Sequence, residues 1–277
     1  VSGVAGDETI SVDAYGASWT YENVSSITAN AGEGNDIIEL VGVRSDAHLM
    51  GGTGDDELLG GQGNDLLEGQ DDADYLSGGA GDDELLGGEG DDFLEGGAGD
   101  DTLDGGEGND GVSYSNASNG VYIDLPSGQV TDGDGGEDTL MSIEQIEGSE
   151  HADNITGNND ADDVIDGLGG NDIINGGAGD DFLIGGAGAD TIDGGAGNDA
   201  TSYLESLAAV SIDLDTGAVF SGGGSDADGD ELYNLENVQG TQYDDEIRGN
   251  EADNFLHGAG GNDVLEGRAG ADTLDGG

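Results

Sequence analysis

The nonapeptide Gly176-Gly-Ala-Gly-Asp-Asp-Phe-Leu-Ile184 decides the fold of this chain, because close copies of it recur in register along most of the sequence. The shared pattern is G-G-x-G-x-D-x-U-x, where U is a large apolar residue, and its positions are numbered here as places one to nine. A second run of copies lies between Gly148 and Ser202, and a third begins at Gly240. A fixed short period of this kind predicts a solenoid of stacked repeats. In the first run, successive copies begin at Gly51, Gly60, Gly69, Gly78, Gly87, Gly96 and Gly105.

The composition is extremely acidic and rich in glycine. The 277 residues include 64 acidic side chains, three arginines and no lysine, which gives a formal net charge of −61. Only 33% of residues are hydrophobic and 59 are glycine, a composition typical of disordered chains. The repeat argues against disorder, because a solvated tail has no reason to keep an aliphatic residue at every ninth position. Since carboxylate repulsion opposes compaction, the compensating cations must come from solution.

Several classes of function are disfavoured by the residue inventory. The absence of cysteine excludes disulfides and thiolate metal sites, and the three histidines, His48, His151 and His257, are far apart in the sequence. The chain has no apolar run long enough to span a membrane, and its charge disfavours nucleic acid and anionic membrane surfaces. No Gly-x-Ser-x-Gly elbow is present. We therefore expect no catalytic residues, no organic cofactor, no nucleic-acid partner and no membrane insertion.

The repeat pattern predicts a loop followed by a short strand. Glycine at places one, two and four permits tight turns and positive φ, and the residue at place eight points inward from the strand. Two copies then make one coil, so that loops 18 residues apart stack on the same side. The predicted inward residues are Leu58, Leu76, Leu94 and Val112 on one side, with Leu67, Leu85 and Leu103 on the other. We predict an all-β fold without helices, because no segment keeps a helical period.

The segments between the runs resemble one another and predict three super-repeats. Ile10–Asp13, Val121–Asp124 and Val210–Asp213 share an apolar alternation of period two, and Tyr114 and Tyr203 occupy matching places. We expect each flank to form irregular β turns on the same stack. The predicted divisions are an N-terminal β flank or cap at 1–50, a repeat block at 51–113, a flank at 114–147, a block at 148–202, a flank at 203–239 and a block at 240–277.

Stacking would bring the place-six aspartates into ladders. Like charges one strand spacing apart repel by about 1–3 kcal/mol per pair at an effective dielectric of 20–80. Ca²⁺ takes six to eight oxygen ligands from carboxylates and backbone carbonyls, and glycine loops expose such carbonyls. Mg²⁺ demands tighter geometry, and transition metals favour the scarce His and Cys. In the first run the ladders are Asp56, Asp74, Asp92 and Asp110 on one side, and Asp65, Asp83 and Asp101 on the other.

The pattern resembles the RTX, or haemolysin-type calcium-binding, repeats of secreted bacterial proteins. This resemblance implies a right-handed parallel β-roll with Ca²⁺ between successive loops, and type I secretion to the cell exterior. It implies no single activity, because RTX regions accompany toxins, proteases, lipases, epimerases and adhesins.

The resemblance also implies ligand sets. Of two stacked loops, the first would give the carbonyls of places two and four with its Asp, and the second those of places one and three with its Asp. In the first run the candidates are Gly52, Gly54, Asp56, Gly61, Gly63, Asp65, Gly69, Asp71, Asp72, Asp74, Gly78, Gly79, Ala80, Gly81, Asp83, Gly87, Gly88, Glu89, Gly90, Asp92, Gly96, Ala98, Asp101, Gly105, Glu107 and Asp110. In the second run they are Asp153, Asp163, Gly167, Leu168, Gly169, Gly170, Asp172, Gly176, Gly177, Ala178, Gly179, Asp181, Gly185, Ala187, Asp190, Gly194, Ala196 and Asp199. In the third run they are Thr241, Tyr243, Asp245, Gly258, Gly260, Asp263, Gly267, Ala269 and Asp272.

Some copies depart from the pattern. Gln70 and Asp72 replace glycines, which predicts a distorted loop that could still hold a cation through its extra carboxylates. One residue is inserted between Gly157 and Asp166, which puts that site in doubt, and Asn254 replaces Asp, which predicts a weak or absent site. Counting loop pairs gives about 11 Ca²⁺ ions. Two acidic turns in the flanks, Asp132–Asp138 and Ser225–Glu231, are either further cation sites or solvated turns.

Three functions remain open at this point. The leading one is a secreted, extracellular repeat region with a structural or adhesive role, unfolded where Ca²⁺ is low and folded outside the cell. An alternative is the accessory module of a secreted enzyme, such as an alginate epimerase, metalloprotease or lipase, whose catalytic domain lies outside this sequence. A third is self-assembly into a surface layer or fibre through the open ends of the solenoid. A linked domain or an end-to-end copy of the chain is accordingly a candidate partner.

Overall fold

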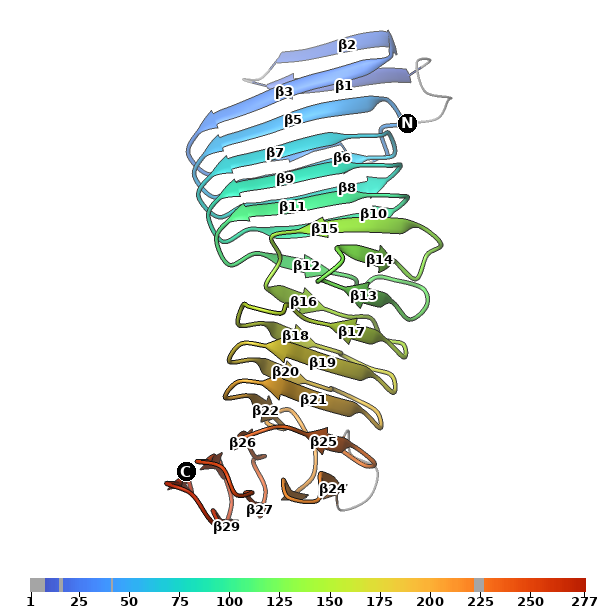
Figure 1. The fold of residues 1–277 in the computed structure, drawn as a ribbon. Coiled ribbons are helices and arrows are strands. Elements are labelled where there is room, and N and C mark those ends of the chain that lie inside the picture. Colours follow the sequence, from blue (N-terminus) through green and yellow to red (C-terminus); the bar gives the residue numbers. More distant parts are fainter. Residues whose placement is uncertain (1–7, 15–16, 41, 222–226) are drawn as a thin grey trace. The chain divides into compact units, whose positions relative to one another are not determined.

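The computed structural model describes residues 8–14, 17–40, 42–221 and 227–277, with side chains from residue 24 onward. Every regular element in these ranges is a β-strand (Figure 1). Within them, no helix is long and apolar enough to cross a membrane. The chain divides into two compact units, Val1–Tyr114 with Gly128–Ile143, and Ser115–Ser127 with Glu144–Gly277.

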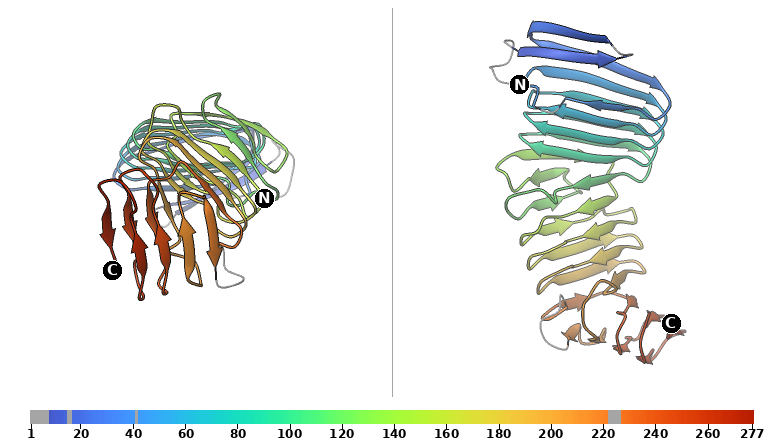
Figure 2. Two further views of the ribbon diagram at one scale, coloured as in Figure 1. Left: turned by 60° about the horizontal axis from the view of Figure 1, so that its bottom comes forward. Right: turned by 180° about the vertical axis from the view of Figure 1, so that it is seen from behind.

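The first unit is built from two parallel sheets, each of which turns one row of aliphatic side chains toward the other. Figures 1 and 2 show its strands, blue to green, as successive parallel rungs. One sheet has the order β4 (Ile37–Glu39), β6 (Glu57–Gly61), β8 (Tyr75–Ala80), β10 (Phe93–Ala98) and β12 (Gly111–Ser113). The other has the order β3 (Ser26–Glu33), β5 (Asp46–Thr53), β7 (Leu66–Asp71), β9 (Glu84–Glu89), β11 (Thr102–Glu107) and β15 (Glu137–Met141), with β14 (Gln129–Thr131) antiparallel to β15.

The second unit repeats this plan. Its last strands, orange to red, lie side by side in the left view of Figure 2. One sheet contains β16 (Gln145–Glu147), β18 (Val164–Asp166), β20 (Phe182–Ile184), β22 (Ala200–Ser202), β26 (Asn237–Gln239), β28 (Phe255–His257) and β30 (Thr273–Asp275). The other contains β13 (Tyr122–Asp124), β17 (Asn154–Thr156), β19 (Ile173–Ala178), β21 (Thr191–Ala196), β25 (Glu231–Tyr233), β24 (Ala218–Ser221), β23 (Val210–Asp213), β27 (Glu246–Arg248) and β29 (Val264–Glu266).

The place-eight residues form the core. Leu58 pairs with Leu76, Leu76 with Leu94 and Leu94 with Val112 in exact 18-residue steps, and all four side chains are fully buried. Leu67, Leu85 and Leu103 form the matching row on the opposite sheet. The predicted all-β parallel β-roll, including the alternation of coils, is therefore confirmed.

The first flank differs from the expectation. The segment Ile10–Asp13 lies in β1 (Glu8–Ala14), which pairs antiparallel with β2 (Ala17–Val24) in a two-stranded sheet of their own. The expectation that this segment stacks on the roll was wrong, because β1 and β2 exchange their backbone hydrogen bonds with each other. The corresponding strands β13 and β23 do stack, pairing parallel with β17 and β27.

Candidate metal centre

The loops are held open by a left-handed residue at place two. Gly52, Gly61, Gly79 and Gly88 have φ of 124°, 126°, 103° and 127°. A Cβ added at Gly52 or Gly79 would also collide with the place-two carbonyl oxygen of the loop stacked before it. Glycine is thus required for the backbone conformation and for the close approach of successive loops.

The place-six aspartates form the predicted ladders. The Asp65 N–H donates to Asp83 Oδ1 at 2.7 Å, and the Asp83 N–H donates to Asp101 Oδ1 at 2.8 Å. On the other side, Asp56 and Asp74 donate to Asp74 and Asp92 at 2.7 and 2.8 Å. Each Oδ1 therefore ties one coil to the next, which leaves only Oδ2 of each carboxylate for another partner.

In most loops Oδ2 accepts no hydrogen bond from any described residue, although it is buried. A buried acceptor without a partner costs about 1–3 kcal/mol, and more when it is charged. Burial, together with the charges of the neighbouring ladder carboxylates, raises the pKa of both Asp74 and Asp83 to about 7. We call these loops open loops. Their aspartates are Asp56, Asp65, Asp74, Asp83, Asp92, Asp101, Asp172, Asp181, Asp190, Asp199 and Asp263.

Backbone carbonyls converge on the same space. A Cβ built on Gly51 would lie 2.5 Å from Asp56 Oδ2 and 2.8 Å from the Gly69 carbonyl oxygen, which is place one of the next stacked loop. The place-three carbonyl of Ala98 also points back at the preceding loop, where it accepts the Gly81 N–H at 2.9 Å. The space beside each place-one glycine thus holds a carboxylate oxygen and a carbonyl oxygen, with no room for a side chain.

This donor set fits Ca²⁺, which accepts carboxylate and carbonyl oxygens in flexible geometry. No group of three His, Cys, Asp or Glu side chains that could hold a metal occurs in the described part of the chain. That agrees with sites made from few carboxylates and several carbonyls. The ion would supply the positive charge that the orphaned Oδ2 atoms lack, and the place-one carbonyls lie beside those atoms. The full ligand sets expected from the sequence stay a prediction.

The loop at Gly69 is regular, contrary to the expected distortion. Gln70 and Asp72 adopt φ of 88° and 78°, so both take the left-handed conformation that glycine has elsewhere. The register with β5 and β9 is unbroken. Asp72 Oδ2 accepts the Gly54 N–H at 3.0 Å, which replaces the usual hydrogen bond to a place-three carbonyl and offsets part of the backbone strain.

Four loops satisfy their place-six side chain internally, and we call them self-capped loops. In the loop at Gly148, the Ser149 N–H donates to Asp153 Oδ2 and the Ser149 hydroxyl to Oδ1, both at 2.7 Å. In the loop at Gly240, the Thr241 N–H and hydroxyl make the same contacts to Asp245 at 2.6 and 2.8 Å. The place-two N–H therefore fills the Oδ2 acceptor that has no described partner in the open loops.

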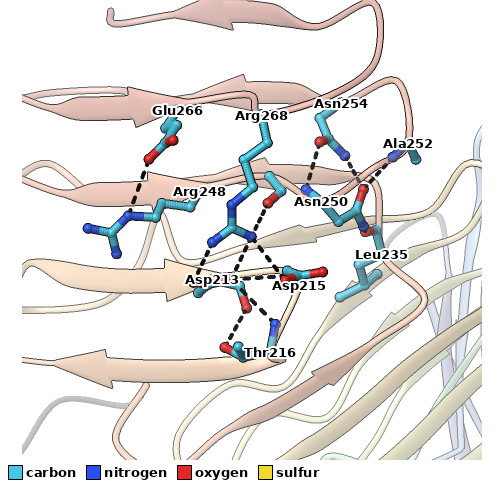
Figure 3. Close-up of polar contacts among 11 residues, drawn as sticks. Asp213, Asp215, Thr216, Leu235, Arg248, Asn250, Ala252, Asn254, Glu266 and Arg268 are labelled. Atoms are coloured by element: carbon cyan, nitrogen blue, oxygen red, sulfur yellow. Dashed lines mark hydrogen bonds and ion pairs between the residues drawn. The ribbon is translucent and has the colours of Figure 1, made fainter.

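The other two self-capped loops use asparagine. The Asn158 N–H and Nδ2 donate to Asp163 at 2.5 and 2.7 Å. In the loop at Gly249, Asn254 replaces the aspartate and accepts the Asn250 N–H at 3.0 Å (Figure 3). Its Nδ2 donates to the Glu236 carbonyl oxygen at 2.9 Å. None of the four place-two residues lies in the left-handed region.

Arginine holds the third run against its flank. Arg268 donates to both carboxylate oxygens of Asp213 at 2.7 and 2.8 Å and to the Gly249 carbonyl oxygen at 2.6 Å (Figure 3). The Arg268 guanidinium lowers the pKa of Asp213. Here a side chain of the protein performs the charge neutralisation that the open loops leave to solution.

One loop at the start of the first run was not predicted from the sequence. Residues Ala31-Gly-Glu-Gly-Asn-Asp36 stack on the loop at Gly51, and the Asp36 N–H donates to Asp56 Oδ1 at 2.8 Å. The Gly34 N–H donates to the place-three carbonyl of Thr53 at 2.7 Å, as in the regular loops. The signal was present as G-x-G-x-D at 32–36, but the coil that follows has 20 residues rather than 18.

The flank turns also continue the ladders. The Asp101 N–H donates to Asp138 Oδ1 at 3.0 Å, and the Asp190 N–H to Asp230 Oδ1 at 2.9 Å. Both carboxylates are buried, so they do not belong to solvated turns, and burial raises the pKa of each to about 7. The Oδ2 atoms accept the hydroxyls of Tyr114 and Tyr203, at 3.1 and 2.9 Å. Residues 225 and 226 of the second acidic turn lie outside the described residues.

Comparison with known proteins agrees with this geometry. The model of the RTX calcium-binding nonapeptide repeat matches in four copies, at residues 50–85, 77–112, 166–200 and 239–274. No curated protein matches the chain significantly. The chain therefore carries RTX calcium-binding nonapeptide repeats, which here form the loops of a parallel β-roll.

Proposed function

We propose that this chain is the calcium-dependent structural or adhesive segment of a secreted bacterial protein and that it folds on binding Ca²⁺ outside the cell. The observation that carries the proposal is the row of buried Oδ2 atoms in the open loops, which have no partner among the described residues. A fold that buries so many unneutralised carboxylates is unfavourable without a cation, so ion binding becomes part of the folding free energy.

The net charge of −61 supports the same conclusion. In a compartment with little Ca²⁺, carboxylate repulsion favours an extended chain, and the thin core offers few apolar contacts to oppose it. Extracellular Ca²⁺ would neutralise the ladders and stack the coils. Counting every loop pair of the nonapeptide runs gives about 11 candidate ions, of which those at the four pairs that begin with a self-capped loop would be the weakest or absent. We expect the open loops to bind them more tightly than pairs that begin with a self-capped loop, because there the cation would have to displace an N–H donor.

A structural role also explains the use of the acidic side chains. The buried aspartates are engaged in ladders, where each Oδ1 accepts a backbone N–H, and the remaining Oδ2 atoms are buried where we propose that Ca²⁺ binds. We expect no catalytic activity from this segment itself. A linked catalytic or adhesive domain would determine what the whole protein acts on or binds.

The proposal is tested by following secondary structure against free Ca²⁺. Far-ultraviolet circular dichroism is expected to report coil with excess chelator and β structure with millimolar Ca²⁺, while Mg²⁺ at the same concentration has much less effect. A chain that is equally folded in chelator would contradict the proposal.

A further inference from the structure

The flank turn that follows the first run contains a second kind of buried carboxylate. Asp132 is 1% exposed, and its Oδ1 accepts three backbone N–H groups, those of Asp134, Gly135 and Gly136, at 2.9, 2.8 and 2.8 Å. These bonds fix the carboxylate, and Oδ2 then points away from them. Oδ2 is buried and accepts no hydrogen bond within the described residues.

Asp132 lies where the regular ladder ends. Asp101 is the last place-six aspartate on its side of the first run, it is also 1% exposed, and its Oδ2 likewise lacks a described partner. The next carboxylate of the ladder, Asp138, is already occupied by the Asp101 N–H on Oδ1 and the Tyr114 hydroxyl on Oδ2. Another oxygen is therefore needed beside Asp101, and Asp132 is the nearby carboxylate with one to offer.

The backbone places a carbonyl at the same point. Gly136 aligns with place four of the loop at Gly96, since Thr139 and Leu140 pair with Thr102 and Leu103. A Cβ added at Gly136 would collide with the Gly99 carbonyl oxygen and lie 2.8 Å from Asp132 Oδ2. The carbonyl oxygen and the carboxylate oxygen thus border one small space that only glycine leaves open.

The pKa of Asp101 also indicates that the carboxylates of Asp101 and Asp132 lie close together. Burial raises the pKa of Asp101 to about 6, and the Asp132 charge adds to that rise more than either Asp82 or Asp100 does. Two buried anions with unpartnered oxygens, next to a carbonyl, form an oxygen-rich and water-poor environment that favours a hard divalent cation.

We propose that Asp132 Oδ2, Asp101 Oδ2 and the Gly99 carbonyl bind a Ca²⁺ ion that closes the C-terminal end of the first run. The site differs from the nonapeptide sites because Asp132 lies outside the repeat pattern and the matched segments, and its side chain stands in for a loop carbonyl. The identity of the ion rests on the proposed function, whereas the site itself rests on the two orphaned oxygens.

The test replaces Asp132 by asparagine in the full chain and counts bound Ca²⁺ by calorimetric titration. Asp132→Asn keeps an oxygen that can accept the three N–H groups but removes the charge and turns the other oxygen into a donor. The number of bound ions is expected to fall by one per chain, with an unchanged circular dichroism spectrum in saturating Ca²⁺. The matched control Asp134→Asn removes an exposed charge from the same turn and is expected to bind as many ions as the wild type.

The outcomes separate this site from the general function. An unchanged ion count in Asp132→Asn would overturn the proposed site while leaving the calcium-dependent fold intact, whereas a wild-type chain that binds no Ca²⁺ would overturn both. Should Asp132→Asn fail to fold, Asp132→Ser provides the second variant, because its hydroxyl can still accept backbone N–H groups of the turn but removes the carboxylate oxygen offered to the ion. The same loss of one ion is expected, and a full count would again contradict the site.

Discussion

Open and self-capped loops differ in what neutralises the buried place-six carboxylate. In the open loop at Gly78, Asp83 has a buried Oδ2 without a described partner, and place two is the left-handed Gly79. In the self-capped loop at Gly240, Asp245 accepts the Thr241 N–H and hydroxyl. The comparison teaches that the place-two peptide decides whether the carboxylate is neutralised by the protein or by an ion from solution.

The self-capped loops occur where a new run begins. The loops at Gly148 and Gly157 open the second run, and those at Gly240 and Gly249 open the third. Because these turns need no cation for their hydrogen bonds, we expect them to depend less on Ca²⁺ than the open loops that follow them. Substitutions and changes of pH can therefore distinguish open loops, which need Ca²⁺, from self-capped loops, which do not.

The largest effect is expected from removing a carboxylate inside an open ladder. Asp83→Ala removes the acceptor of the Asp65 N–H and the orphaned Oδ2, so it affects the spaces on both sides of the loop. The Ca²⁺ concentration at the folding midpoint is expected to rise roughly tenfold or more, about 1.4 kcal/mol or more, with reduced cooperativity. Circular dichroism titration measures this. Glu84→Ala, which removes the neighbouring exposed charge, is the control and should leave the midpoint nearly unchanged.

The pH is expected to act in opposite directions with and without calcium. The pKa of Asp74, Asp83 and Asp172 is raised to about 7 by burial, from 3.8 in the unfolded chain. Their stabilising contribution to the metal-free fold is therefore complete below about 3.8 and is lost as the pH rises through about 7. In chelator, β structure should increase as the pH falls from 8 towards 4.

With Ca²⁺ the sign reverses, because the ion requires ionised carboxylates and protons compete with it. The midpoint Ca²⁺ concentration should increase as the pH falls from 8 to 5. If the chelated chain were equally unfolded at pH 4 and pH 8, the burial of the ladder carboxylates would not be the cause of the calcium requirement.

A smaller effect is expected from converting a self-capped loop into an open one. Thr241→Gly removes the hydroxyl cap and allows the left-handed conformation at place two, so Asp245 would become available to a cation. Loss of the cap should cost about 0.5–2 kcal/mol at limiting Ca²⁺, and saturating Ca²⁺ should restore that stability. Thermal unfolding at several Ca²⁺ concentrations measures both. Equal losses at low and high Ca²⁺ would mean that Asp245 gains no ion.

The periodic features of the fold could be predicted because each follows from the nine-residue spacing alone. Stacking at 18 residues fixes the row from Leu58 to Val112 and the ladders through Asp83. The self-capped loops were not predicted, because Thr241 was interpreted only as a carbonyl donor and Ser149 was given no role. The absence of glycine at place two does not by itself identify a self-capped loop, since Leu168 keeps the left-handed conformation with φ of 64°. Serine, threonine and asparagine leave that conformation, and their side chains supply hydrogen bonds that compensate.

The acidic flank turns were recognised as possible cation sites, but their place in the aspartate ladders was not predicted, for a related reason. Gly133-Asp-Gly-Gly-Glu-Asp138 has its place-six aspartate and, after it, the buried Leu140 at place eight, but Asp134 replaces the glycine at place two. The hydrogen bond from the Asp101 N–H to Asp138 shows that this turn continues the aspartate ladder. A strict motif therefore underestimates the length of the ladder, whereas the weaker pattern of an aspartate two residues before an aliphatic residue identifies it.

The smallest effect on calcium is expected at Asn254. In Asn254→Ala the loop loses the hydrogen bonds to the Asn250 N–H and the Glu236 carbonyl oxygen, which should cost about 1–3 kcal/mol of stability. The number of bound Ca²⁺ ions should not change, because the amide already fills the place of the cation. Calorimetric ion counting, paired with thermal unfolding in saturating Ca²⁺, distinguishes the two quantities. A lost ion would mean that a loop can cap itself and still bind calcium, and the division between open and self-capped loops would no longer hold.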